Sequence, residues 1–440
     1  MFTAAEAERL IFTLVTSVQE TEMLELMGAK HDLMARVLAA PVRSKLDFPH
    51  WDNSAMDGYA VRAADMKQLP VTLEIIEEIP AGKRPQKTVN SGQAARIFTG
   101  AMMPEGADTV VMQEETTCDG NEVKLLNRTE KRVEQKIEPG TFVRKRGSFS
   151  KVGDILLPAG RSLTPAEIAL IAAAQQTQVR VYRRPKVAIL STGNELAQAN
   201  EPLNPGQIVD SNQYALSALV AQTGAIPIPL GIVKDDREAV KAAIASALSQ
   251  ADMVISTGGV SVGDYDYVDD ILAELGATLH IRSVAVKPGK PLTVATIDSA
   301  NADSANADSA KDSANGSANG SVQSRQVYFG LPGNPASAMV GFWRFVAPAI
   351  AKLSGRLESD WGPTLVWAEA TSELNAGGRR ETYLWGQLQA GKDGYQFGRA
   401  AGSHSSGNLV NLANTSGLGI VPQGETSIAI GQRVRVLAIR

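Results

Sequence analysis

The chain has 440 residues, a formal net charge of −4 and 20% charged residues. Its length allows roughly two to four domains with sizeable cores, and its charge gives no reason to expect nucleic acid or an anionic membrane surface as the main partner. A single cysteine, Cys118, excludes an intrachain disulfide and a cysteine-based zinc site, and four histidines are too few for a histidine-rich metal site.

The N-terminus lacks the basic region and apolar core of a secretory signal. No apolar run approaches the roughly 18 residues of a membrane-spanning helix. We therefore expect a cytoplasmic protein that does not enter a membrane.

The first segment of the chain is predicted to be helical. Thr3 and Glu6 fit a capping box, and apolar residues follow at helical spacing. A second helical pattern covers 22–40 and ends at Pro41, and a third helix, 164–174, begins with Thr-Pro. We expect a split domain of helices and linkers, which we assign to residues 1–46 and 143–184.

Residues 47–142 are predicted to form a β-rich domain inserted into this split domain. Short β-like runs alternate there with Gly, Pro and Asn turns, which is typical of a small β structure. The runs are 71–76, 94–98, 109–113 and 122–126.

Residues 185–355 are predicted to form an α/β domain. Strand-like and helical runs alternate in the order 186–190, 213–223, 226–233, 236–250, 252–256 and 268–275. This alternation predicts a central parallel sheet with helices on both faces. A further helix at 336–353 is followed by β-like runs with Gly turns, so residues 356–440 are predicted to form a small C-terminal β domain.

The segment 298–324 interrupts the α/β pattern. It repeats NADSA and continues into a tract of Ser, Ala, Asn and Gly, so we expect a disordered insert. The flanking runs 292–297 and 326–329 look like strands, so the insert should extend a loop between them. We expect no catalytic role for it.

Polar residues and glycines gather where the predicted parallel strands end. The residues at two of these ends are Thr192, Gly193, Asn194, Glu195, Gly258, Gly259, Ser261, Gly263, Asp264 and Asp266. Open α/β sheets bind ligands at this edge. The motif is neither a Walker A loop nor G-x-G-x-x-G, and taken alone it is compatible with an ordinary strand-to-helix turn.

The acids at these ends suggest a metal-bridged ligand. Carboxylates repel phosphate unless a divalent cation lies between them, so their combination with backbone donors indicates magnesium (Mg2+). Asp210 and Asp235 lie at further element boundaries of the same unit. Each of these two alone is more typical of a helix cap or a solvated loop.

Two further loops carry candidate anion donors. Lys287-Pro-Gly-Lys290-Pro291 places two ammonium groups in a stiff turn, which suits an oxyanion or phosphate site, although a solvated loop is the simpler interpretation. The run GLPGNPAS at 330–337, which includes Asn334, is either an anion-binding turn at a helix N-terminus or only a sharp connection. The C-terminal region adds donors such as Arg379 and Ser406.

Six motifs occur in an order similar to that of one known family. They are DNSAMDGYA at 52–60, FTGAMMP at 98–104, STGNEL at 191–196, STGGVSVGDYDYV at 256–268, KPGKP at 287–291 and GLPGNPAS at 330–337. Together they resemble the molybdopterin molybdenumtransferases, the family that includes the E domain of gephyrin. The resemblance implies an elongated homodimer of four-domain subunits, with the active site between the α/β domain of one subunit and the β-rich domain of the other.

The resemblance also implies a reaction. This reaction is the magnesium-dependent insertion of molybdate into adenylylated molybdopterin, with release of AMP and molybdenum cofactor. An upstream molybdopterin adenylyltransferase is the implied protein partner.

Matching motifs carry roles over to this chain. Glu195, Asp235 and Asp266 would hold magnesium or the adenylyl phosphate region of the substrate. The implied catalytic residues are Asp57, Asp235, Asp266, Lys287 and Lys290. The implied substrate-binding residues are Thr99, Thr192, Gly193, Asn194, Asp210, Gly258, Gly259, Ser261, Gly263, Asp264, Pro291, Asn334, Arg379 and Ser406. Among them, Asp57 and Thr99 would belong to the wall that the partner subunit supplies.

The chain departs from the family pattern in two places. Relatives commonly carry an acidic pair where Ser148 and Phe149 follow Gly147 here. Relatives also commonly have a lysine at the position of Ser283, and the adjacent Arg282 would point to the opposite face of a strand. The alternative hypothesis is therefore a non-catalytic or specialised molybdopterin-binding scaffold of the same fold.

Overall fold

The computed structural model describes residues 1–27, 33–126, 138–259, 268–298, 325–402, 404 and 407–439. The chain divides into two compact units. The first unit comprises Met1–Ala40, Ala159–Pro165 and Gln178–Arg440, and the second comprises Pro41–Pro158 and Ala166–Thr177. None of the helices in these described ranges is long and apolar enough to cross a membrane.

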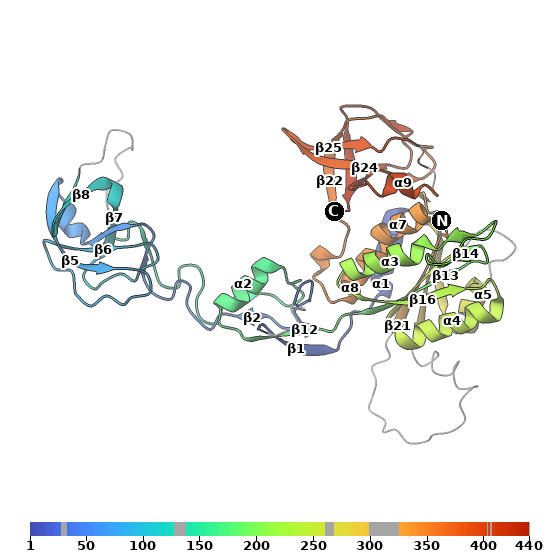
Figure 1. Ribbon diagram of the computed structural model, residues 1–440, viewed down its shortest axis with the longest axis horizontal. Coiled ribbons are helices and arrows are strands. Elements are labelled where there is room, and N and C mark those ends of the chain that lie inside the picture. Colours follow the sequence, from blue (N-terminus) through green and yellow to red (C-terminus); the bar gives the residue numbers. More distant parts are fainter. Residues whose placement is uncertain are drawn as a thin grey trace, which may run out of the picture. The chain divides into compact units, whose positions relative to one another are not determined.

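A six-stranded sheet forms the centre of the α/β part of the first unit (Figure 1). Its strand order is β16 (Ile226–Val233), β13 (Lys186–Thr192), β17 (Met253–Thr257), β21 (Arg325–Leu331), β20 (Pro291–Asp298) and β18 (Thr278–Ser283). The first four strands are parallel, as predicted. The strands β20 and β18 are antiparallel additions at one edge, which the strand and helix alternation did not predict.

Helices cover both faces of this sheet, as the sequence predicted. Alternate residues of β13 enter opposite cores: Val187 and Ile189 join one, whereas Ala188 and Leu190 join the other. The first core also contains residues of α3 (Ser211–Gln222), and the second contains residues of α4 (Arg237–Gln250) and α5 (Val268–Glu274). A strand buried on both faces explains why the strand sequences are continuously apolar.

The first helix, α1 (Ala4–Leu14), begins with the predicted capping box. Glu6 N donates to Thr3 Oγ1 over 3.2 Å, and Thr3 N donates to Glu6 Oε2 over 2.9 Å. Its buried residues join the first core, where α1 contacts α8 (Ala347–Leu353).

The predicted helix at 22–40 is wrong. Strand β1 (Thr21–Glu25) lies there instead and pairs antiparallel with β12 (Gln178–Tyr182), and the described residues 33–40 contain no helix. Leu, Met and Glu favour helices, but pairing with a distant segment has overridden this local preference. α1 therefore packs on α8 rather than on a second N-terminal helix.

The predicted helix at 336–353 contains a π-helical turn. It consists of α7 (Pro335–Gly341), the turn η4 (Phe342–Val346) and α8. Ala347 N donates to the carbonyl of Phe342, five positions earlier. The next residue, Pro348, has no N–H to continue the regular ladder, so the wider turn fits this position.

The C-terminal part of the first unit is a small closed sheet. Its strand order is β19 (Val286–Lys287), β24 (Glu381–Gly391), β25 (Gly394–Arg399), β22 (Leu365–Ala370), β28 (Arg433–Ala438) and β26 (Gly417–Val421). β24 also pairs with β26, which closes the sheet. The strand β19 comes from the α/β segment, so the two parts of this unit share a sheet.

The second unit contains a further six-stranded sheet. Its order is β7 (Thr109–Met112), β4 (Gly58–Val61), β6 (Gln93–Ile97), β5 (Val71–Ile79), β9 (Glu122–Leu125) and β8 (Thr116–Asp119). The four predicted runs are confirmed as β5, β6, β7 and β9, whereas β4 and β8 were missed. The third predicted helix is confirmed as α2 (Pro165–Ala173).

Short elements complete the described chain. They are β2 (Val42–Arg43), β3 (Asn53–Ser54), η1 (Ala63–Met66), η2 (Gln113–Glu115), β10 (Val143–Arg144), β11 (Ile155–Leu157), β14 (Leu196–Ala197), β15 (Ile208–Val209), η5 (Glu358–Asp360), β23 (Leu374–Asn375), α9 (Leu409–Leu412) and β27 (Ser427–Ile428). The four-domain division stays a prediction.

The predicted strands on either side of the insert are confirmed. β20 and β21 are antiparallel neighbours, paired as far as Asp298 and Arg325. Residues 299–324 therefore join the ends of two paired strands, and the predicted disorder of this segment lies outside the described residues.

Candidate active site

A cavity of about 790 Å³ lies where the parallel strands of the α/β sheet end. Its lining includes the last residues of two strands and the loops that follow four strands: Thr192 at the end of β13 and Glu195 after it, Asp235 after β16, Thr257 at the end of β17 and Gly258 and Gly259 after it, and Pro332, Gly333 and Asn334 after β21. Four strands thus deliver polar groups to one space, which we call the strand-end cavity. This is the edge at which open α/β sheets bind ligands.

The two acids of the strand-end cavity come from loops that bind each other. Asn194 N donates to Asp235 Oδ2 over 3.3 Å, and Asp235 N donates to Asn194 Oδ1 over 3.2 Å. The Glu195 carboxylate folds back over Gly193, where a Cβ would lie 2.7 Å from Glu195 Oε2. The structure therefore brings Glu195 and Asp235 to the same cavity, as predicted from the sequence.

The glycines after β17 allow two strand ends to approach closely. Gly258 has a φ of +86°, and a Cβ there would lie 2.2 Å from the carbonyl oxygen of Thr192. Only glycine combines this left-handed conformation with such an approach. The Gly-Gly pair therefore shapes the cavity through its backbone.

The start of α3 contributes residues that the sequence analysis missed. Ser211 and Asn212 line the strand-end cavity, and Asn212 Nδ2 donates to the carbonyl of Gly333 over 2.7 Å. Asp210 caps α3 through Gln213 N, 3.2 Å from Oδ1. Asp210 Oδ2 and Asn212 Oδ1 are buried and have no hydrogen-bond partner among the described residues. The Asp-Ser-Asn run before a helix was the available signal.

The lysine loop, residues 287–291, meets the cavity at one end. Pro291 lines the cavity, whereas Lys287 and Lys290 are exposed. Val284 N donates to the carbonyl of Lys290 over 3.0 Å, which closes the turn. Arg379 is exposed and lies just before β24, the strand that pairs with β19 and hence with Lys287.

Asp57 and Thr99 are direct partners in the second unit. Thr99 N and Thr99 Oγ1 donate to Asp57 Oδ1 over 2.7 and 2.8 Å. These hydrogen bonds, led by the backbone one, hold the pKa of the Asp57 carboxyl below its usual value. Both are predicted site residues, and the contact between them is a finding of the structure.

Several predicted site residues lie outside the described residues. They are Ser261, Gly263, Asp264, Asp266 and Ser406. Among the residues that the structure describes, no group of three or more His, Cys, Asp or Glu side chains could hold a metal ion. The predicted set of three magnesium ligands therefore stays a prediction.

The two departures from the family pattern lie in parts of the chain that the structure describes. Arg282 Nε lies 2.8 Å from Asp269 Oδ2 on α5, so its guanidinium is already paired. Ser283 lies opposite Pro291 in the β18–β20 pairing. Arg282 therefore does not replace a lysine at position 283. Phe149 is 72% exposed in the second unit.

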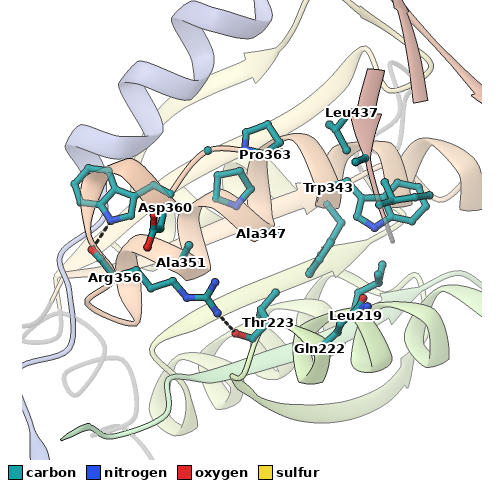
Figure 2. A pocket seen from close by; sticks show the side chains of 16 residues that line it. Leu219, Gln222, Thr223, Trp343, Ala347, Ala351, Arg356, Asp360, Pro363 and Leu437 are labelled. Carbon is teal, nitrogen blue, oxygen red and sulfur yellow. Dashed lines mark hydrogen bonds between the residues drawn. The ribbon is translucent and has the colours of Figure 1, made fainter. Parts of the chain in front are cut away.

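A second cavity, of about 240 Å³, lies beside α3 and α8 (Figure 2). Figure 2 shows Arg356 reaching Thr223, whose carbonyl accepts from Nη2 over 2.6 Å. Trp343 and Pro363 also line this space. None of the predicted site residues that the structure describes lines it, so it is separate from the strand-end cavity.

Three family descriptions cover most of the chain. Residues 2–174 match the MoeA N-terminal region (domain I and II), residues 188–352 match a probable molybdopterin binding domain, and residues 368–439 match the MoeA C-terminal region (domain IV). These three matches agree in order with the motifs that carry the resemblance.

Individual proteins agree with these matches. A molybdopterin molybdenumtransferase from Nostoc sp. is 52% identical over 99% of this chain and 93% of its own length. One from Bacillus subtilis is 33% identical over 96% of this chain and 90% of its own. The crystal structure of a molybdopterin biosynthesis moeA protein from Pyrococcus horikoshii superposes with a TM-score of 0.76, 25% identity and full coverage of both chains. The chain therefore belongs to the molybdopterin molybdenumtransferase family of molybdenum cofactor biosynthesis.

Proposed function

We propose that this chain inserts molybdate into adenylylated molybdopterin with the help of magnesium, and releases AMP and molybdenum cofactor. The strand-end cavity is the observation that carries the proposal. Its volume of about 790 Å³ suits a nucleotide-linked substrate, and it joins two carboxylates to the glycine-rich backbone after β17. The family relationship supplies the identity of the pterin and of the metal oxyanion.

Glu195 and Asp235 fit a magnesium ion. Magnesium is usually bound by one or two carboxylates together with substrate phosphates rather than by a protein cage. Both carboxylates line the cavity, so they would hold the ion, with Asp266 as the third predicted ligand. The bound ion would supply positive charge that neutralises the phosphoanhydride of the substrate.

The lysine loop and Arg379 are suited to bind molybdate, the second substrate. Molybdate is a tetrahedral dianion, and fixed ammonium and guanidinium donors stabilise such an anion and the negative charge that develops on a leaving phosphate. Lys287 and Arg379 come from adjoining segments, because β19 pairs with the start of β24. No side chain has to act as nucleophile, since an oxygen of molybdate or water can attack the anhydride.

The proposal also includes partners and a location. A homodimer would let Asp57 and Thr99 of one subunit face the strand-end cavity of the other. An upstream adenylyltransferase would deliver the substrate in the cytoplasm. The family relationship supports these points, and the mass of the purified protein in solution tests the dimer.

A scaffold that binds molybdopterin without turnover is the second candidate. Two observations favour it: Ser283 stands where relatives commonly have lysine, and the neighbouring Arg282 is engaged by Asp269. An enzyme and a scaffold differ in whether AMP is released.

The deciding experiment measures AMP release from adenylylated molybdopterin by the purified protein with magnesium. The enzyme should release AMP when molybdate is added and stay near background without it. Tight binding of the substrate without molybdate-dependent release would overturn the proposed activity and favour the scaffold.

A neighbouring pair of acids gives a matched test of the site. Asp235→Asn should lose most magnesium-dependent release, because one carboxylate of the cavity is removed. Asp236→Asn is the control, since Asp236 caps α4 through Ala239 N over 2.9 Å and asparagine caps helices equally well. Equal activity in the two variants would remove Asp235 from the site.

A further inference from the structure

The lysine loop is anchored by segments that are far apart in the sequence. On one side, Ala285 N donates to the carbonyl of Phe2 over 2.7 Å, just before α1 begins. On the other side, β19 pairs with β24, and Glu381 N donates to the carbonyl of Ala285 over 3.0 Å. The placement of Lys287 therefore depends on both the N-terminal segment and β24.

A polar network with a buried centre joins these same segments. Arg344 lies in the π-helical turn η4, and its Nη1 and Nη2 donate to the Glu8 carboxylate of α1 over 2.5 and 3.2 Å. Its Nε donates to the Tyr383 hydroxyl over 3.0 Å, and that hydroxyl donates to Glu381 Oε1. One guanidinium thus connects α1 and η4 to the first residues of β24.

The two central residues of this network are buried, whereas Glu8 and Glu381 are partly exposed. Arg344 is 7% exposed and Tyr383 is 1% exposed. Burial raises the pKa of the Tyr383 hydroxyl, so it stays protonated and can donate to Glu381. Removing one partner leaves the remaining buried groups without their hydrogen bonds, which is costly and favours a shift of the neighbouring strand.

We propose that Arg344 is a positioning residue for the lysine loop. This inference rests on the proposed function, in which Lys287 and Lys290 bind the metal oxyanion. Arg344 is not among the residues that line the strand-end cavity. It acts through Tyr383 and Glu381, which set the position of β24 and therefore of β19. Substitution of Arg344 should therefore weaken the binding of molybdate. The binding of adenylylated molybdopterin should change little, because the strand-end cavity holds most of it.

Tyr383→Phe is the sharpest test, because it removes only the hydroxyl between Arg344 and Glu381. The ring and the pairing of Arg344 with Glu8 remain. We expect the KM for molybdate to rise about tenfold, while kcat and the KM for adenylylated molybdopterin change by less than about twofold. Arg344→Met should raise the KM for molybdate further than Tyr383→Phe does. Arg344→Lys should raise it less than Arg344→Met does.

Two controls separate positioning from stability. Tyr328→Phe removes another buried hydroxyl, which hydrogen-bonds Ser256 Oγ. Arg183→Met breaks the pairing of Arg183 with Asp252, in which both N···O distances are 2.7 Å. Both controls should lower the melting temperature and leave the KM for molybdate as in the wild type.

Molybdate binding measured by calorimetry keeps this test independent of turnover. If the wild type binds molybdate but releases no AMP, the proposed activity fails, and weaker molybdate binding by Tyr383→Phe than by Tyr328→Phe still supports the positioning role. Equal effects of these two variants on molybdate would overturn that role. Equal changes in the KM values for both substrates would overturn it as well, as would a wild type that does not bind molybdate.

Discussion

Substitution of Gly258 by alanine tests how closely the two strand ends must approach. Gly258 has a φ of +86°, and a Cβ would meet the carbonyl oxygen of Thr192 at 2.2 Å. The left-handed conformation costs a residue with a Cβ about 1–2 kcal/mol. Forcing a methyl group against backbone adds roughly 1–3 kcal/mol, so we expect a loss of about 2–5 kcal/mol in the free energy of unfolding.

Gly231→Ala separates these two contributions. Gly231 has a φ of +87°, lies in β16 of the same sheet, and a Cβ there would have no atom within 4 Å. The free energy of unfolding of this control should fall only by the cost of the left-handed conformation, about 1–2 kcal/mol. Chemical denaturation compares the two variants, and AMP release should fall in Gly258→Ala alone, since the end of β13 must move. Equal stability and equal activity of the two variants would refute the role of the close approach.

Three further changes have defined outcomes. Deleting residues 299–324 should leave the melting temperature and AMP release near those of the wild type, and a fall of many degrees in calorimetry would contradict this. Thr3→Ala should cost about 1 kcal/mol in chemical denaturation, because it removes the cap of α1, whereas Thr3→Ser should be nearly neutral. The pKa of Asp57 is lowered in the folded state, so its contribution to stability is present above its ordinary pKa of 3.8 and is lost as the pH falls through the lower folded value. Thr99→Val should therefore lower the melting temperature near about pH 7, and its difference from the wild type should narrow as the pH falls below 3.8, whereas a difference that is constant with pH would argue against this linkage.

Local patterns predicted the elements whose structure is decided locally. β13 and β17 are apolar runs bounded by polar turns, and α1 begins with side chains that cap it within three residues. The prediction of a helix at β1 was wrong because this strand forms by pairing with β12, a segment far along the chain. The residues of β1 alone favour a helix, so only the pairing reveals the strand.

The candidate site also combines residues that local patterns predict with contacts that depend on distant segments. Glu195 and Asp235 could be predicted because each lies within three residues of the end of a recognisable strand, and parallel strands end at one edge. The contact of Asn212 with Gly333 could not be predicted from the sequence, because it depends on how α3 packs beside the loop after β21. The link from Arg344 to the lysine loop passes through three distant segments, and no spacing in the sequence encodes it.

The pairing of β20 with β21 suggests a place to attach a reporter to this protein. Asp298 and Arg325 are the last paired residues of these strands, and Arg325 begins β21, whereas the strand-end cavity lies where β21 ends. Seven residues of β21 separate the two edges, which corresponds to about 20 Å of extended strand. A fluorescent domain that replaces residues 299–324 would therefore be joined at the edge of the sheet away from the cavity, and would allow substrate binding to be followed in a labelled protein.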